Sequence, residues 1–281
     1  MRASTGSART AICHALSPVH VSSVDDPRLD LYRALKGDHR RRPHFVAESD
    51  LAVRRLLGSD LAVDSVLCTP AHLPRIVDAV PEHVALLVAE EALIAEVAGF
   101  PFHRGCLAAG RRPAPAPPDL ARFAALPRAR IVIAENLVDP ANVGALLRNC
   151  RAFRTDLVLL DARAADPFSR RAIRASLGHS FTQPLALVPD LLAEAHRLRD
   201  LGLTLLAATV SPDARPITTL APPPRLALLL GNESSGLSPS LLSLAHQRVT
   251  IPIDPSADSL NVASATAILL HWGTGSTDPT R

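Results

Sequence analysis

The sequence predicts an α/β protein whose C-terminal half is built on a mainly parallel sheet. Short apolar runs such as 130–135 and 226–230 are long enough for buried strands and too short for helices. They alternate with segments of helical pattern, which is typical of a parallel sheet covered on both faces. Polar turns follow several of these runs, and open α/β sheets form their ligand crevices at such strand ends.

Composition indicates a globular protein and gives little functional signal by itself. The 281 residues suffice for one large or two ordinary domains, with 47% hydrophobic and 20% charged residues. The net charge of +3 is mild, and all basic residues except Lys36 are arginine, which we attribute to composition bias. An argument for nucleic-acid binding must therefore rest on clustering of charge.

The cysteines and the apolar runs predict a cytoplasmic protein without metal or membrane segment. The four cysteines lie far apart and form no paired metal-ligand spacing, so we expect reduced thiols. No apolar run reaches the roughly 20 residues of a membrane span. The first residues have a basic start without the apolar core of a signal peptide.

A proline-rich segment divides the chain into two expected domains. Residues 1–25 lack periodicity and are expected to form a flexible tail, and 26–110 a small α/β domain with helices at 29–35, 50–57, 71–77 and 90–97. Alternating Pro and Ala favour an extended spacer over 111–128. Residues 129–273 form the second domain, followed by a tail at 274–281.

Three polar segments of the second domain are candidates for chemistry. In the first, a helix begins near Ala141, with Asn142 in its first turn and Arg148 expected near the same face. The second is Asn232-Glu233, directly after the apolar strand 226–230. The third, Ser259-Leu260-Asn261, heads the last helix. Taken singly, each is also explained by helix capping, an ordinary turn or a solvated arginine.

Together the three segments resemble a known family. NVGALLRNCRAF, LLLGNESSGLS and IPIDPSADSLNVASATAILLH match, in order and spacing, the motifs of the SpoU (TrmH-like) RNA ribose 2′-O-methyltransferases of the SPOUT superfamily. The match covers about residues 130–272. The stretch HFVAESDLAVRRLLGS is similar to the small RNA-binding α/β domain that often precedes the catalytic domain in this family.

The resemblance implies a fold, a cofactor and a set of site residues. It implies a deep trefoil knot in the C-terminal domain, S-adenosylmethionine as cofactor, and a homodimer. Carried onto matching positions, the cofactor pocket would include Gly231, Ile251 and Leu260. The polar site would comprise Asn142, Arg148, Glu233, Ser259 and Asn261. Arg148 is the residue that we expect to activate the ribose hydroxyl, with help from an RNA phosphate.

Two departures from the family pattern affect loops. Ser234 replaces the usual glycine after Asn-Glu, and Asp254-Pro255-Ser256 replaces a glycine after the Ile-Pro element. Every polar motif residue is nevertheless in place.

Clusters of arginine are the expected RNA contacts. One run lies at Arg40, Arg41 and Arg42, and a pair follows at Arg54 and Arg55. A second group lies at 163–174. Charge runs are usually solvated faces, but beside an RNA enzyme they would supply phosphate contacts. Aromatic residues are scarce, which favours reading of shape and phosphates over base stacking.

The sequence therefore predicts an S-adenosylmethionine-dependent RNA 2′-O-methyltransferase acting on ribosomal RNA, or secondarily on transfer RNA. Two alternatives remain: an RNA-binding protein that keeps the fold without turnover, and a SPOUT enzyme that methylates a base. The Ser-Leu-Asn head of the last helix favours ribose over base.

Overall fold

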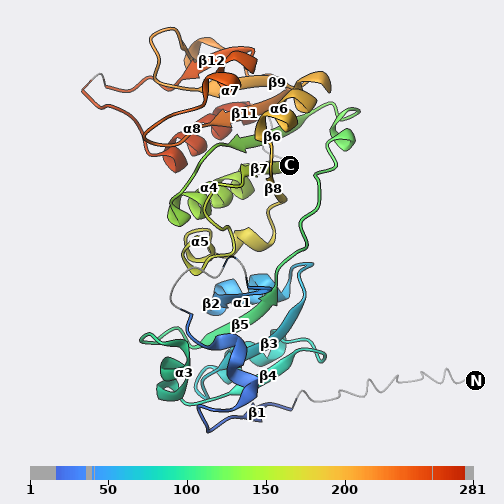
Figure 1. Cartoon of the computed structure of the whole chain (residues 1–281), viewed down its shortest axis with the longest axis vertical. Helices are drawn as coiled ribbons and strands as arrows, with labels where there is room; N and C mark the ends of the chain where they lie inside the picture. Colours follow the sequence, from blue (N-terminus) through green and yellow to red (C-terminus); the bar gives the residue numbers. More distant parts are fainter. Residues whose placement is uncertain (1–16, 36–39, 41, 255, 276–281) are drawn as a thin grey trace, which may run out of the picture.

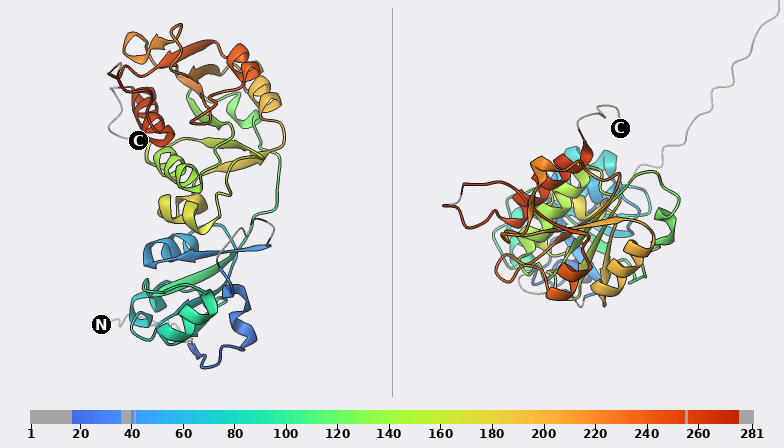
Figure 2. Two further views of the ribbon diagram at one scale, coloured as in Figure 1. Left: turned by 60° about the vertical axis from the view of Figure 1, so that its left-hand side comes forward. Right: turned by 90° about the horizontal axis from the view of Figure 1, so that it is seen from above.

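Two β-sheets, one in each half of the chain, are arranged along the long axis of the molecule (Figures 1 and 2). The computed structural model describes residues 17–35, 40, 42–254 and 256–275. Strands up to residue 111 form the first sheet, and strands from residue 129 onward form the second. The segment between them runs along one side of the molecule, as the green trace in Figure 1 shows.

The first sheet is mixed and has five strands. Their order is β1 (Val19–His20), β4 (Ala85–Val88), β3 (Val63–Cys68), β5 (Cys106–Arg111) and β2 (His44–Glu48). Strand β5 runs antiparallel to β2 and β3, whereas β1, β4 and β3 are parallel. The accompanying helices are η1 (Pro27–Tyr32), α1 (Asp50–Leu57), α2 (Leu73–Ile76), η2 (Val77–Ala79) and α3 (Glu91–Ala98).

Helix α1 follows the sequence prediction, and the N-terminal tail does not. Ser49 caps α1 by accepting from the Ala52 N–H, and the helix ends at Gly58, as the capping pattern indicates. The prediction of a flexible tail over 1–25 is wrong near its end, because Val19–His20 forms strand β1, which pairs with Leu87–Val88. Two predicted helices also differ from the structure. The 3₁₀ helix η1 covers the first part of the predicted 29–35, and within the predicted 71–77 the α-helix is limited to α2.

The second sheet is parallel throughout, as predicted. Its seven strands lie in the order β10 (Arg215–Pro216), β12 (Gln247–Thr250), β9 (Thr204–Ala208), β11 (Arg225–Leu230), β6 (Ala129–Ala134), β7 (Leu157–Asp161) and β8 (Leu185–Val188). The helices are η3 (Ala121–Phe123), α4 (Pro140–Ala152), α5 (Arg170–Ala175), η4 (His179–Phe181), α6 (Leu191–Asp200), η5 (Ile217–Thr219), α7 (Pro239–Leu244) and α8 (Val262–Thr274).

Helices cover both faces of this sheet, and the alternation of its apolar residues explains how. In β6, Val132 and Ala134 pack with residues of α4 and α8, whereas Ile131 and Ile133 pack with residues of α6 and α7. Successive side chains of a strand point to opposite faces, so an all-apolar strand requires a layer on each side.

The two halves share an apolar interface. Phe168 and Phe181, from the second half, pack in the core of the first sheet and stack on Phe45, with ring centroids 5.0 and 5.3 Å apart. Above them, Arg112 donates two hydrogen bonds to the Asp166 carboxylate, at 2.9 and 2.7 Å. The segment between the sheets is therefore not a plain spacer, since it contributes this ion pair.

Local contacts set two element boundaries and one helix contact in the second half. Helix α5 begins only at Arg170, because Ser169 caps it and Asp166 accepts from the Phe168 N–H in a preceding turn. Strand β12 ends at Thr250, before Pro252, which has no N–H for a strand ladder. Within α4, a Cβ at Gly144 would lie 2.3 Å from the Ala172 carbonyl oxygen, so glycine permits the close contact with α5.

Candidate functional site

A cavity of about 370 Å³ lies at the carboxyl ends of β9, β11 and β12. Parallel strands end at one edge of a sheet, which is why loops far apart in the sequence meet there. The lining includes all three residues predicted to bind cofactor, Gly231, Ile251 and Leu260, together with Glu233 and Ser259. The volume lies within the range of small-molecule sites, roughly 300–1,000 Å³.

The turn that follows β11 is organised by Asn232. Its side-chain oxygen accepts from the Ser234 and Ser235 N–H groups, at 2.8 and 3.1 Å, and its amide donates to the Asn136 carbonyl at 2.9 Å. The sequence interpretation named Asn232 as part of a candidate segment, but it did not include Asn232 among the site residues. Ser234 fits this turn with its N–H satisfied, so the departure from glycine does not prevent the loop from closing.

Gly231 is required at the mouth of this loop. A Cβ atom there would lie 2.2–2.5 Å from backbone atoms of Gly236 and Leu237. Real Cβ contacts do not occur at such distances, so only glycine lets the two ends of the turn approach each other. The backbone of Gly231 consequently lies bare along the cavity wall.

A hydrogen-bond network joins the three polar segments beside the cavity. The Asn142 amide donates to Glu233 Oε1, and Asn142 Oδ1 accepts from the Asn261 amide at 2.9 Å. Asn261 also caps α8, because its Oδ1 accepts from the Ala263 N–H at 2.9 Å. Of the two residues in Ser259-Leu260-Asn261 that could cap the last helix, Asn261 therefore does so; Ser259 is exposed and lines the cavity instead.

Arg148 lies apart from this network, contrary to the expectation that it shares a face with Asn142. Six residues at about 100° each place the two side chains about 120° apart around α4. The Arg148 side chain is exposed and lies towards η4. There, burial together with the charges of Arg55, Arg151 and Arg148 lowers the pKa of His179.

The cysteines that the structure describes are buried thiols. Cys68, Cys106 and Cys150 are free thiols, in agreement with the prediction for the described cysteines. Burial raises the pKa of Cys68 to about 11 and those of Cys106 and Cys150 to about 12. They are therefore protonated at neutral pH, whereas the thiolate is the reactive form.

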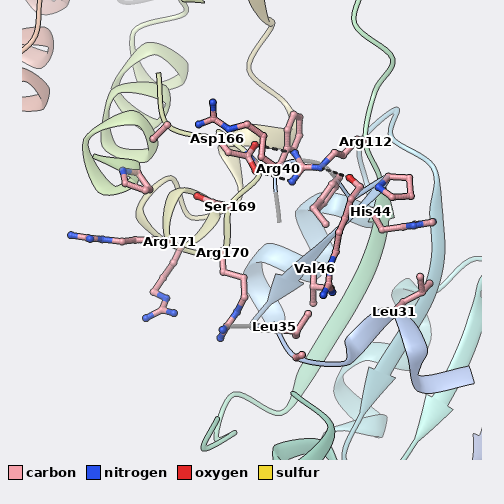
Figure 3. A pocket seen from close by; sticks show the side chains of 18 of the residues that line it. Leu31, Leu35, Arg40, His44, Val46, Arg112, Asp166, Ser169, Arg170 and Arg171 are labelled. Carbon is pink, nitrogen blue, oxygen red and sulfur yellow. Dashed lines mark hydrogen bonds and ion pairs between the residues drawn. The ribbon is translucent and has the colours of Figure 1, made fainter. Parts of the chain in front are cut away.

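A second cavity, of about 860 Å³, lies between the two halves and is strongly basic (Figure 3). The arginines that line it are Arg33, Arg40, Arg42, Arg112, Arg163, Arg170, Arg171 and Arg174. The acidic groups in its lining are Asp30 and Asp166, and Asp166 is paired with Arg112. Figure 3 shows Arg40 and Arg112 beside Asp166, with Arg171 extending away from the first half.

The predicted RNA-binding arginines fall into two groups in the structure. Arg40 and Arg42 line the basic cavity, where Arg40 donates to the carbonyls of Ala162 and Ala164. Arg54 and Arg55 are not part of its lining; Arg54 pairs with Asp50 and Asp78, and Arg55 donates to the Leu177 carbonyl. Arg41 lies outside the described residues.

Residues 129–271, which carry the second sheet and the network, match the family model described as "SpoU rRNA Methylase family". The chain belongs to this family. It is 34% identical over 266 residues to an uncharacterized tRNA/rRNA methyltransferase of Mycobacterium bovis, with 91% of each chain covered.

Solved structures of similar fold align with almost the whole of this chain. One titled RNA 2′-O ribose methyltransferase is 26% identical, with a TM-score of 0.73, and covers 92% of this chain and 98% of its own. An AdoMet-bound rRNA methyltransferase from Sinorhizobium meliloti, 24% identical, has a TM-score of 0.75 and covers 91% of this chain and 97% of its own. Among the described residues, no helix combines the length and apolarity needed to cross a membrane.

Two substitutions at Asn261 separate its capping role from its role in the network. Asn261→Ala removes both, and we expect it to lower the free energy of unfolding by about 1 kcal/mol. Asn261→Asp keeps the acceptor for the Ala263 N–H but cannot donate to Asn142 when ionised. Denaturant unfolding should find the Asp variant close to the unsubstituted protein. Equal destabilisation of both variants would contradict the capping assignment.

Proposed function

We propose that this protein transfers a methyl group from S-adenosylmethionine to a ribose 2′-hydroxyl of structured RNA. The observation that carries the proposal is the network of Asn142, Glu233 and Asn261 beside a cavity of small-molecule size. Membership of the SpoU family supports methyl transfer to RNA, and the 26% identical structure titled a 2′-O ribose methyltransferase supports the ribose as acceptor. Ribosomal RNA is the first candidate substrate and transfer RNA the second.

The cavity at the ends of β11 and β12 is the proposed cofactor site. The bare backbone of Gly231 offers polar groups, while Ile251 and Leu260 offer apolar surface for an adenosine. S-adenosylmethionine supplies the methyl group, already activated by the sulfonium charge. A neighbour of the same fold is titled as AdoMet-bound, which agrees with this assignment.

The remaining chemistry is to orient the ribose hydroxyl and to remove its proton. Glu233 is a carboxylate whose Oε1 already accepts from Asn142, so its other oxygen is positioned to accept from a substrate hydroxyl. Ser259, exposed at the cavity, is the proposed second orienting group. The network would hold Glu233 in place before substrate arrives, which limits the entropy lost on binding.

Arg148 is the proposed activating residue, acting together with an RNA phosphate. Arginine stays protonated, so it is better suited to binding an RNA phosphate, through which it would act on the hydroxyl, than to acting as a base. Its position, about 120° around α4 from Asn142 and about 9 Å along the axis, requires a substrate that reaches around the helix. A polynucleotide offers a phosphate and a ribose at such a separation.

The basic cavity between the halves is the proposed RNA-binding surface. Both halves contribute arginines to it, and Arg163 and Arg171 are about two-thirds exposed, at 65% and 66%. Phosphate contacts supply most sequence-independent affinity for nucleic acid. We assign Arg54 and Arg55 to structural contacts instead, because their guanidinium groups bind the carbonyls of Arg75 and Leu177.

We further propose the family's homodimer, its trefoil knot in the C-terminal domain, the domain division at the proline-rich segment, and a cytoplasmic location.

Ile268, 40% exposed on α8, is apolar surface suited to a contact between copies. Light scattering at micromolar protein should give the mass of two chains; the mass of one chain would contradict the homodimer.

Arg148→Ala tests the reaction and the role of this residue together. Label from S-adenosylmethionine should appear on ribose 2′-oxygens of unmodified ribosomal or transfer RNA with the unsubstituted protein. In the variant, transfer should fall by about 10²–10⁴-fold while cofactor affinity stays nearly unchanged. Arg151→Ala, on the same helix, is the matched control and should retain transfer.

Each alternative has its own outcome in this assay. Label on a base would replace the ribose reaction with base methylation. Cofactor binding without transfer to either RNA class would indicate a non-catalytic RNA-binding protein. Full activity of Arg148→Ala would remove Arg148 from the mechanism.

The double variant Arg171→Ala/Arg174→Ala tests the basic cavity. We expect weaker RNA binding and a shallower dependence of affinity on salt, by about 0.7–0.9 in logarithmic slope for each lost phosphate contact. Cofactor affinity should not change. Arg197→Ala is the control, because Arg197 is also about half exposed and ion-paired but lies on α6, outside the cavity. Unchanged RNA affinity in the double variant would refute this surface.

A further inference from the structure

Three potential metal ligands meet in the first half of the chain, far from the methyltransferase cavity in the sequence. Asp50 is the first residue of α1, His72 precedes α2, and Cys106 is the first residue of β5. One ligand atom from each lies within 4.8 Å of the others. The sequence interpretation excluded a metal on the basis of cysteine spacing, which does not detect ligands brought together from three separate elements.

His72 is held with an unused nitrogen directed at this cluster. Its Nε2 atom is buried and makes no hydrogen bond within the described part of the chain. The ring packs directly over Gly105, where a Cβ atom would lie 2.2 Å from Nδ1. A buried polar atom without a hydrogen bond is costly, so an imidazole fixed in this state calls for an explanation.

The separation of ligand atoms suits a tetrahedral ion. Nε2 of His72 lies 3.4 Å from Oδ1 of Asp50, which is long for a hydrogen bond. Two ligands bonded to a tetrahedral zinc at about 2.0 Å lie about 3.3 Å apart. The sulfur of Cys106 completes a set within reach of one ion after shifts of about an ångström.

The chemistry of the set favours a zinc-like divalent ion. Thiolate, imidazole and carboxylate are all zinc ligands. One thiolate and one carboxylate together cancel a charge of +2, which lowers the cost of burying the ion. Arg54 Nε lies 3.3 Å from Oδ1 of Asp50, but its Nη2 also reaches Asp78 at 3.3 Å, so Arg54 keeps a partner if that oxygen is taken.

We propose that Asp50, His72 and Cys106 form a binding site for a divalent transition metal of the zinc class, with water as fourth ligand. Binding displaces the thiol proton of Cys106 to solvent, so the ion meets a thiolate. The metal ties together the starts of α1, α2 and β5. Helix α1 also carries Arg55, which donates to Leu177 of the second half, so the metal steadies an element at the interface between the halves.

Cobalt binding to the full-length protein, stripped with a chelator, tests the proposal. One equivalent of Co²⁺ should produce a thiolate-to-cobalt charge-transfer band and the intense visible bands of a four-coordinate site. Cys106→Ser should abolish the charge-transfer band, and His72→Gln should weaken cobalt binding at least tenfold. Cys150→Ser is the matched control, since Cys150 is an equally buried free thiol in the other half, and it should retain the spectrum.

Two outcomes would overturn the site: absence of the charge-transfer band in the unsubstituted protein, or its persistence in Cys106→Ser. Unfolding supplies a second readout. Zn²⁺ should raise the Tm of the unsubstituted protein and of Cys150→Ser. Asp50→Asn, whose side chain is 43% exposed and tolerant of change, should lose most of that increase even if a cysteine variant folds poorly. An equal increase in all variants would also count against the site.

Discussion

The side-chain amide of Asn142 is the contact on which the candidate site depends. It donates to Glu233 after β11 and accepts from Asn261 at the start of α8, so it joins its own segment to two others that lie 91 and 119 positions further along the chain. Because an ionised carboxylate accepts hydrogen bonds but donates none, an aspartate does not replace the amide in this arrangement. The network is exposed, and it is therefore available to a ligand as well as to its own partners.

The parallel sheet brings these segments to one place. Strands β6 and β11 pair in register over their whole length, from Ala129 opposite Arg225 to Ala134 opposite Leu230. The Glu135 N–H then continues the ladder to the Leu230 carbonyl, at 2.9 Å. Both strands consequently end at the same edge of the sheet, which places the turn before α4 next to the Asn232-Glu233 turn. The Glu135 side chain adds a further bond, to the Ser238 N–H at 2.7 Å.

The interface between the halves fixes the position of the basic cavity relative to the edge of the second sheet that carries the candidate site. Phe45, Phe168 and Phe181 form an apolar contact that is insensitive to salt, while Arg112 and Asp166 form an ion pair with side chains only 15% and 6% exposed. Removing one partner of such a buried pair leaves an uncompensated charge. The pair therefore fixes the relative position of the two halves more than it adds stability. Arg40 and Arg55, which the sequence assigns to RNA, also cross this interface, because they donate to backbone carbonyls of the second half.

Sequence reasoning recovered what depends on local pattern. Short apolar runs alternating with helical segments predicted the parallel sheet, and the predicted helix over 50–57 agrees with α1. It was wrong where two neighbouring residues can fill the same role, or where residues far apart in the sequence come together in the fold. Ser259 and Asn261 are both good caps, and only the contact with Asn142 favours Asn261. The Asp50–His72–Cys106 cluster has no sequence signature, and the 168–181 aromatics give no sign that they belong to the first core.

The edge formed by the loops after β11 and β12 is the proposed cofactor site. Hydrogen–deuterium exchange with and without S-adenosylmethionine tests this site most directly, since ligand binding slows exchange where the backbone is held. We expect protection of residues 231–237 and of the residues that follow β12, with the first sheet unchanged. Protection centred on the first half, or no protection at saturating cofactor, would contradict it.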